Sequence, residues 1–229
     1  MTPAERCSFI RKHTRIERTP LVPEIELHLA SEALPLWQAS EEELQTIGLP
    51  PPFWAFAWAG GQALARWVLD EPESVQGRRV LDFGAGSGLV AIAAARAGAA
   101  SVTAVDVDPF AAAAIELNAT HNQVAVTVVI EDLIGRLDGG WQVVLAGDIC
   151  YERPMAERAF AWLQALAAMD TLVLLGDPKR TYLPKKGLEP LARYSVKTSR
   201  ELEDSDLRNA IVWRVLPPSD HAERPSLTQ

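Results

Sequence analysis

From about residue 78 onward, short apolar segments alternate with Ala- and Leu-rich segments of helical length. The apolar segments are rich in Val, Leu and Ile, as are strands that are buried on both faces. Regular alternation of strands and helices predicts a parallel sheet with right-handed crossover connections. The predicted strands are Arg79–Phe83, Ser101–Asp106, Val124–Val129, Trp141–Ala146 and Thr171–Leu175, and the predicted helices among them are Leu89–Ala97, Pro109–Asn118 and Ala156–Ala168.

The C-terminal part of the chain breaks this alternation. Two further apolar segments, Ala192–Thr198 and Ala210–Leu216, are joined by the polar sequence ELEDSDLRN, which favours a turn over a helix. We therefore predict an antiparallel hairpin at one edge of the sheet. Parallel strands followed by such a hairpin are typical of the Rossmann-like, seven-strand α/β fold of methyltransferases rather than of the dehydrogenase fold.

The length of 229 residues suits one domain with a modest N-terminal extension. The run Pro50-Pro51-Pro52 marks a joint, and a helix at Gly61–Leu69 follows it. Before the joint, Leu21 to Leu29 alternate apolar and polar residues, which predicts a short strand or an extended arm. We expect an N-terminal helical or extended cap over residues 1–50, the methyltransferase domain over 51–217 and a disordered tail over 218–229.

Composition excludes several classes of function. The formal net charge is −8, so the chain has no general attraction for nucleic-acid backbones. Its two cysteines are too few for a disulfide framework or a four-thiolate zinc site, and its four histidines lack ligand spacing, so we expect no metal. No apolar run is long enough for a membrane span.

The N-terminal segment bears on cellular location. Its first twenty residues lack the apolar stretch of a secretory signal, which favours a cytoplasmic protein. The same residues contain five Arg or Lys against two Glu, so a mitochondrial transit peptide is the alternative.

The first predicted strand runs into a glycine loop, VLDFGAGSGL. Gly84 and Gly86 allow a tight turn and a close approach of ligand to backbone, and the next helix starts at once, with its free N–H groups facing the ligand. A dinucleotide fingerprint would need glycine where the chain has Leu89. Asp82, two residues before the loop, suits the ammonium group of S-adenosylmethionine and would repel the phosphates of NAD.

Two more carboxylates follow the next strands. Asp106 lies at a strand end, where it can accept hydrogen bonds from both ribose hydroxyls of a nucleoside. Asp132 follows the third strand and can accept from an adenine amino group. Taken singly, Asp82, Asp106 and Asp132 are equally explained by strand-end polarity or helix capping. Their joint position at one sheet edge favours a ligand site, because ligands of open α/β sheets bind there.

The fourth strand leads into Asp148-Ile149-Cys150-Tyr151. Asp148 and Tyr151 are predicted to be catalytic, because a carboxylate and a phenol can orient a lysine amine and take up its proton. The alternative for Tyr151 is a packed loop aromatic. Adenine methyltransferases have prolines in this loop, and their absence here argues against a nucleobase acceptor.

An aromatic segment precedes the first predicted helix. Trp54, Phe56 and Trp58 lie just before Gly60-Gly61-Gln62, which we interpret as a turn. Aromatic faces can hold a sulfonium or an ammonium group by cation–π attraction. The alternative is that some of these rings are core anchors.

A basic segment follows the fifth strand. Lys179, Arg180, Lys185 and Lys186 come directly after Gly176-Asp177-Pro178. Runs of this kind are usually solvated faces. Their place at the functional edge favours the capture of an acidic face of a protein partner.

These motifs together resemble those of a known family. PPFWAFAWAGGQALARWVLD, RRVLDFGAGSGLVAIAAARAGA, VTAVDVDPFAAAAIELNA, VVLAGDICYE and LLGDPKR are similar to segments of the electron transfer flavoprotein β-subunit lysine methyltransferases, which carry a D-x-x-Y motif. One departure is Trp58-Ala59, where relatives have tryptophan and proline. The resemblance implies S-adenosylmethionine as cofactor, held by Trp58, Gly61, Gln62, Asp82, Gly84, Ala85, Gly86, Asp106, Val107, Asp132 and Leu133.

The resemblance also implies a partner. The expected substrate is a lysine of the electron transfer flavoprotein β subunit, with an acidic ribosomal stalk protein as a further substrate of bacterial members. The alternatives are a small-molecule N-methyltransferase of nicotinamide type, which needs a closed lid instead of an open aromatic channel, and a nucleotide-binding module or NAD enzyme. We expect a monomer.

Overall fold

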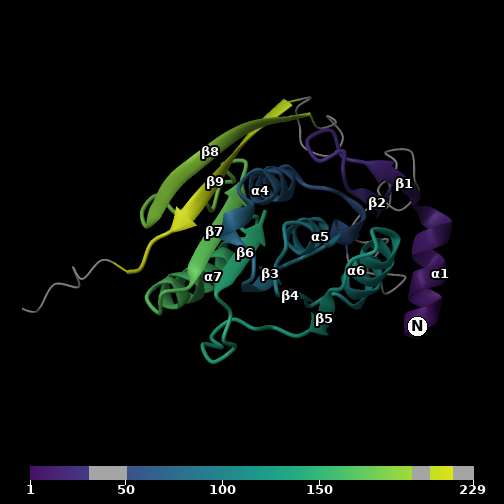
Figure 1. Ribbon diagram of the computed structural model, residues 1–229, viewed down its shortest axis with the longest axis horizontal. Helices are drawn as coiled ribbons and strands as arrows, with labels where there is room; N and C mark the ends of the chain where they lie inside the picture. The colour runs from purple at the N-terminus through teal and green to yellow at the C-terminus, as the bar shows by residue number, and fades with distance from the viewer. Residues whose placement is uncertain (31–50, 198–206, 219–229) are drawn as a thin grey trace, which may run out of the picture.

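The computed structural model describes residues 1–30, 51–197 and 207–218. Their core is a seven-stranded sheet with strand order β5-β4-β3-β6-β7-β9-β8. Strands β5, β4, β3, β6 and β7 pair in parallel in that order. Strand β9 pairs antiparallel with β7 and with β8, which forms one edge of the sheet, as the sequence predicts (Figure 1). The strands are β3 (Arg79–Phe83), β4 (Ser101–Asp106), β5 (Thr127–Ile130), β6 (Val143–Gly147), β7 (Leu172–Asp177), β8 (Leu188–Lys197) and β9 (Leu207–Val215).

Four helices cover the sheet. Helices α4, α5 and α6 share one hydrophobic core on one face, and α7 packs in a second core on the other face (Figure 1). Alanine is abundant in the first core, and its small side chain lets helix backbones approach the sheet closely. The helices are α4 (Ala59–Asp70), α5 (Leu89–Arg96), α6 (Pro109–His121) and α7 (Arg153–Ala167), with short 3-10 turns at Phe53–Ala55 and Pro72–Ser74.

Several boundaries differ from the sequence prediction for local reasons. β5 begins at Thr127, three residues after the predicted start at Val124, because the Val124 N–H still bonds to the Ala119 carbonyl at the end of α6. Helix α7 starts at Arg153 because Pro154 suits the first helical turn. Strand β8 begins at Leu188 and includes Pro190, which an edge strand with a bulge tolerates.

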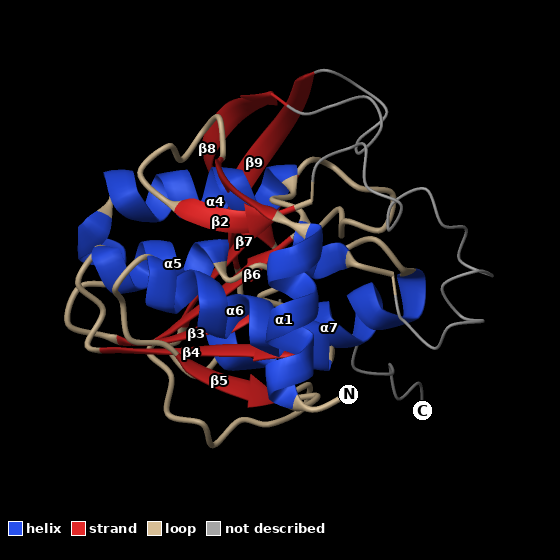
Figure 2. Cartoon of the chain, turned by 90° about the vertical axis from the view of Figure 1, so that its right-hand side faces the viewer, coloured by secondary structure: helices blue, strands red, loops and turns tan. Residues whose placement is uncertain are grey.

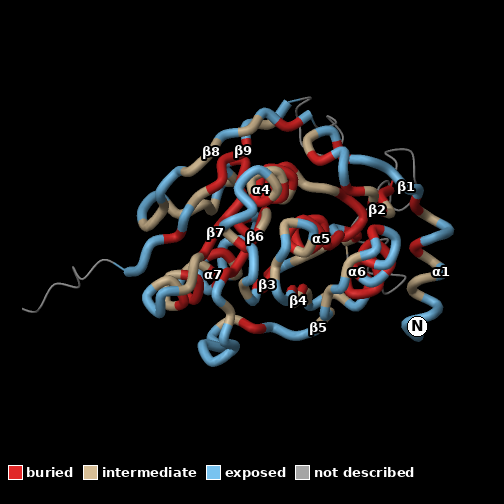
Figure 3. The backbone as a smooth tube through the Cα atoms, viewed as in Figure 1, coloured by how far each residue is buried: buried red, intermediate tan, exposed pale blue. Residues whose placement is uncertain are grey.

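The N-terminal segment forms a helix and a small sheet. Helix α1 (Pro3–His13) lies within the predicted helical or extended cap, but its bounds were not predicted, although Thr2 and Glu5 form a capping box around Pro3, which is a helix-start signal. Strand β2 (Glu26–Leu29) realises the predicted short strand and pairs antiparallel with β1 (Arg15–Arg18). Helix α1 buries only Ile10, whereas α5 is buried along most of its length (Figure 3).

Asn118 of α6 and Asn122, the residue that caps the C-terminus of this helix, attach this segment to the catalytic fold. The Asn118 side chain accepts from the His28 N–H at 2.7 Å, and the Asn122 side chain donates to the Glu26 carbonyl at 2.6 Å. Asn118 also donates to the Ser87 carbonyl in the glycine loop at 2.8 Å. Helix α1 lies against α6 (Figure 2). The N-terminal segment is therefore bonded to the helix that supports the predicted ligand loop.

Parts of the predicted domain division fall on residues 31–50 and 219–229, outside the described residues, so the division stays a prediction. Among the helices of the described ranges, none combines the length and the apolar character that crossing a bilayer requires.

Candidate functional site

A cavity of about 470 Å³ opens at the carboxyl ends of the parallel strands. Such a volume suits a ligand of nucleoside size, and this edge is where open α/β sheets bind ligands. Eight of the thirteen predicted site residues line it, namely Trp58, Gly84, Gly86, Asp106, Val107, Asp132, Asp148 and Tyr151. The other five, Gly61, Gln62, Asp82, Ala85 and Leu133, are not part of the lining.

The glycine loop forms one wall of the cavity. Gly84 has φ 66° and Gly86 has φ 52°, left-handed conformations that side chains rarely adopt. A Cβ atom on Gly86 would meet no atom within 4 Å, so the outer side of the loop is open. Glycine is thus required here by backbone conformation, and the open side leaves room for a ligand to approach the backbone.

Asp106 ties this loop to the end of β4. One of its carboxylate oxygens accepts from the Gly86 N–H at 2.9 Å, and the other accepts from the Asp108 N–H at 3.0 Å. Burial raises the pKa of the Asp106 carboxyl, and these backbone hydrogen bonds oppose the rise. Because each carboxylate oxygen has two lone pairs, both oxygens can still accept a hydrogen bond from a hydroxyl group of a ligand.

The end of β5 presents a second carboxylate. Asp132 accepts from the Ile134 N–H at 3.0 Å and pairs with Arg158 of α7 at 3.1 Å. Val107 lies beside it in the lining, with 68% of its surface exposed. The side chain of Leu133 is buried in the core under α7, outside the lining.

Asp82 lies beneath the loop instead of in the cavity. It is 1% exposed, and its carboxylate accepts from the Ala91 N–H at 2.8 Å in the first turns of α5. Burial raises the pKa of this carboxyl to about 7. In this structure Asp82 holds the loop against α5 and lies outside the lining, and its contact with a ligand ammonium stays a prediction. Ala85 likewise lies outside the lining and bonds to the Val105 carbonyl.

The Gly60-Gly61-Gln62 segment lies in the first turn of α4, which begins at Ala59, two residues before the predicted helix start at Gly61, so these residues are helical and do not form a separate turn. The helix start crosses directly over the ends of β6 and β7, and a Cβ atom on Gly60 would collide with the Gly176 carbonyl. This approach brings the Gly61 N–H to within 2.7 Å of Asp148 Oδ2. Gln62 is buried and donates to the Ala57 carbonyl at 2.6 Å.

Asp148 therefore acts as the N-terminal cap of α4 from another part of the chain. The local N-cap residue, Trp58, provides no side-chain cap bond, and the free N–H groups of a helix start favour a nearby carboxylate. Burial raises the pKa of the Asp148 carboxyl, and the Arg180 guanidinium and the α4 amides oppose the rise. The second oxygen of Asp148 forms an ion pair with Arg180 at 2.7 Å.

Aromatic rings form the outer wall on this side. Phe53 lies 5.4 Å from Tyr151 and 6.1 Å from Trp58 between ring centres, and both Phe53 and Tyr151 are exposed. Trp54 and Phe56 are each 3% exposed and belong to a core cluster under α6, as the core-anchor alternative states. Trp54 also touches the cavity.

Sequence reasoning missed some of the site and misassigned another part. Phe53 and Met155 also line the cavity. The one sequence signal for them is their position, because Phe53 directly precedes the segment 54–58 and Met155 follows the D-x-x-Y loop. Arg180 was grouped with the surface lysines, but it lies in the lining and contacts Asp148. Within the described ranges, no three His, Cys, Asp or Glu residues are placed to hold a metal ion.

Comparison with known proteins gives consistent results. The ribosomal protein L11 methyltransferase (PrmA) family model matches residues 64–149. The magnesium protoporphyrin IX methyltransferase of Synechocystis PCC 6803, solved with bound SAM, superposes with a TM-score of 0.51 at 22% identity, covering 67% of this chain and 76% of that one. This likeness shows the fold.

Two curated relatives are much more similar in sequence. The electron transfer flavoprotein beta subunit lysine methyltransferase of Xenopus laevis is 40% identical over 92% of this chain and 87% of its own length. The Homo sapiens protein of the same name is 34% identical over 92% of this chain and 82% of its own length. With such identity over nearly the whole length of both chains, this protein belongs to the electron transfer flavoprotein beta subunit lysine methyltransferase family.

Proposed function

We propose that this protein transfers methyl groups from S-adenosylmethionine to lysine side chains of the electron transfer flavoprotein β subunit. The relatives in this family are named for that activity and that substrate. One observation carries the proposal on the structural side. The D-x-x-Y residues Asp148 and Tyr151 line the same cavity as the glycine loop and Asp106, so donor and acceptor groups share one space.

The cavity fits the donor by its chemistry. Gly84 and Gly86 leave an open backbone face, Asp106 keeps acceptor capacity for ribose hydroxyls, and Asp132 provides an acceptor for an adenine amino group. When bound, S-adenosylmethionine supplies a methyl group that leaves the sulfonium sulfur, with the bonding electron pair remaining on sulfur, as the lysine nitrogen forms the new bond.

The residues of the chain would position the acceptor. Asp148 is fixed by the α4 amides and can accept a hydrogen bond from an incoming amine. Phe53, Trp58 and Tyr151 offer apolar faces along which a lysine stem and its charged head can enter.

The exposure of this aromatic wall favours a protein acceptor over a small one. Tyr151 is 49% and Phe53 is 43% exposed, so the wall opens to solvent, whereas a nicotinamide-type enzyme needs its acceptor enclosed. The match to the ribosomal protein L11 methyltransferase model ends at residue 149. It does not include Tyr151 or Arg180 on the acceptor side.

Three finer proposals accompany this function. We propose that the protein is a monomer, acts in the cytoplasm and binds no nucleic acid. The net charge of −8 supports the last of these, because like charges repel a phosphate backbone.

A labelling experiment tests the function. The purified protein is incubated with radiolabelled S-adenosylmethionine and either the purified flavoprotein or nicotinamide, and products are identified by peptide mass spectrometry. We expect label on β-subunit lysines only. Label on nicotinamide alone would replace the proposal with its small-molecule alternative. Binding of NAD without binding of S-adenosylhomocysteine in calorimetry would remove the methyltransferase assignment.

A further inference from the structure

Arg180 connects three parts of the acceptor side of the cavity. Its guanidinium donates to Asp148 Oδ1 from Nε at 3.1 Å and from Nη2 at 2.7 Å. The same guanidinium lies 5.5 Å from the centre of the Trp58 ring. Its backbone N–H donates to Asp177 Oδ1 at 2.7 Å. The arginine is thus fixed at its backbone and at its tip, as a permanent part of the site would be.

The backbone on both sides of this ion pair is held in an uncommon conformation. Asp148 has φ 57° and Lys179 has φ 67°, and neither is glycine. Such conformations cost free energy and persist only where surrounding contacts impose them, often at functional sites. The pairing of Gly147 with Gly176 and the bond from the Asp148 N–H to the Gly176 carbonyl at 2.9 Å hold the backbone at Asp148. The bond from the Arg180 N–H to Asp177 Oδ1 closes the turn that contains Lys179.

A charge argument gives this arrangement a consequence for the acceptor. A lysine ammonium has a pKa near 10.4 and must lose a proton before its nitrogen can attack a methyl carbon. A bare carboxylate beside it would stabilise the ammonium and oppose that loss, whereas a guanidinium opposes the ammonium. A carboxylate already paired with a guanidinium can still orient an amine by hydrogen bonding without attracting a full positive charge.

We propose that Arg180 is a positioning residue that neutralises the Asp148 charge, so that the acceptor lysine reaches the donor as a neutral amine. This inference rests on the proposed lysine methyltransferase function. The ammonium releases one proton to water at the open mouth of the cavity before its nitrogen attacks. Arg180 acts through Asp148 and by its own charge, and it takes no part in the bonds that form and break.

Other charges around the cavity set the background for this effect. Asp177 and Cys150 lie close to the pair, and burial raises the pKa of Asp177 to about 7 and that of Cys150 to about 12. On the donor side the lining holds Asp106, Asp108, Glu131, Asp132 and Arg158. The first turn of α4 adds no charged side chain. Arg180 is therefore the positive group nearest to Asp148 among the described residues of this lining.

The test is a pH–rate profile of methyl transfer to the purified flavoprotein at saturating donor, from pH 7 to 10.5. For the Arg180→Gln variant we expect the midpoint of the rising limb to move up by about one pH unit, with about tenfold slower transfer at pH 7.5 and rates that converge at high pH. Arg180→Lys keeps the positive charge and is expected to keep the wild-type midpoint. It also serves if Arg180→Gln folds poorly.

A matched control removes a charge that does not reach the cavity. Arg193 of β8 is exposed and lies outside the lining, and Arg193→Gln should leave the profile unchanged. An equal loss at every pH with an unmoved midpoint in Arg180→Gln would mean that the arginine is only a structural clamp. A lower KM with faster transfer at pH 7.5 would mean that Arg180 competes with lysine for its site. Either result overturns the inference.

Failure of the underlying function would look different. If the wild-type protein methylates no flavoprotein lysine at any pH while it binds S-adenosylhomocysteine, the proposed function fails, and the inference fails with it. If the wild type is active and only the predicted midpoint shift is missing, the function stands and the role of Arg180 is refuted.

Discussion

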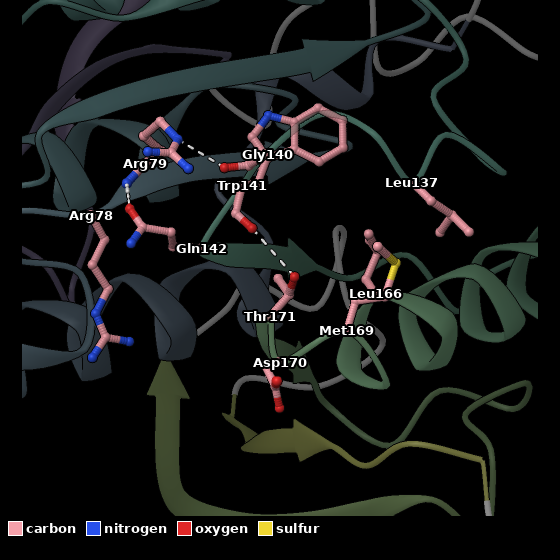
Figure 4. Close-up of a pocket in the computed structure, with 10 residues that line it drawn as sticks. All are labelled: Arg78, Arg79, Leu137, Gly140, Trp141, Gln142, Leu166, Met169, Asp170 and Thr171. Carbon is pink, nitrogen blue, oxygen red and sulfur yellow. Dashed lines mark hydrogen bonds between the residues drawn. The ribbon is translucent and has the colours of Figure 1, made fainter.

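A cavity lies at each of two edges of the central sheet, one at the amino ends of the parallel strands and one at their carboxyl ends. The two cavities have the same volume but different chemistry. Each measures about 470 Å³. The cavity at the amino ends of the strands is lined by residues such as Arg79, Gln142 and Thr171 (Figure 4). There, Arg79 Nε donates to the Gly140 carbonyl at 2.8 Å, and the Arg79 N–H donates to the Gln142 side chain at 3.0 Å. Its polar groups are used to join chain segments.

The cavity at the carboxyl edge instead gathers carboxylates. The N-termini of α4 and α6 point to this edge, and their free N–H groups favour negative charge. Asp148 binds the start of α4, and Asp108 binds the start of α6. The direction of the strands and helices, more than the volume of the cavity, therefore distinguishes the two edges.

The largest effect is expected from a substitution of Asp148 in the cavity at the carboxyl edge. Asp148→Asn keeps an oxygen for the Gly61 N–H and removes the charge that pairs with Arg180. We expect turnover to fall by about 100-fold or more, because a misplaced acceptor amine can cost about that much in rate. S-adenosylhomocysteine affinity, measured by calorimetry, should stay within about twofold. Turnover at the wild-type rate would exclude Asp148 from catalysis.

A smaller effect is expected on the donor side, at Asp106. Asp106→Asn removes a charge that accepts from the Gly86 N–H and faces the cavity. Loss of charge-assisted hydrogen bonds should weaken S-adenosylhomocysteine binding by about tenfold to 100-fold. Calorimetric titration measures this, and thermal melting of the free protein serves as the folding control. Unchanged affinity would place the nucleoside elsewhere.

A third effect concerns stability against pH at Asp177. Burial raises the pKa of Asp177 from 3.8 to about 7, and its Oδ2 atom is buried with no hydrogen-bond partner among the residues that the structure describes. Between about pH 4 and pH 7 the folded state holds this proton more strongly than the unfolded state, so this group makes stability fall as pH rises through that window.

Asp177→Asn should remove this contribution and flatten the decline, because an amide does not titrate. Urea unfolding from pH 5 to 8 measures the slope. The Asn side chain still accepts from the Arg180 N–H, so the turn should persist. A steeper decline in the variant would contradict the assignment. Asp82, whose pKa is also raised to about 7, should keep a residual slope in both proteins.

The smallest expected effect is at the amino edge. Arg79→Gln removes the bond to the Gly140 carbonyl and should cost about 1 kcal/mol of unfolding free energy. Methyl transfer and S-adenosylhomocysteine binding should stay within about twofold, because the cavity there carries no catalytic group. A large loss of transfer by a protein with normal stability would show that the two edges are coupled.

Much of the fold could be predicted from the chain because its signals are local. β3 and β4 have the predicted bounds, since buried parallel strands are short apolar runs flanked by turn residues. Asp106 and Asp148 could be placed at one edge, since strand ends in a parallel sheet share an edge. The bounds of helix α1 were missed because its core-facing side reduces to Ile10, too little for an apolar periodicity.

By itself, the sequence determined the strand–helix alternation, the glycine loop and the edge at which the carboxylates gather, because backbone conformation and strand direction follow from neighbouring residues. Only the tertiary structure decided what those carboxylates touch. Asp82 faces α5. Asp148 follows β6, caps a helix through Gly61, 87 residues away in the chain, and pairs with Arg180, which follows the neighbouring strand β7. Such contacts depend on how closely α4 packs over Gly147 and Gly176, which distant residues set together.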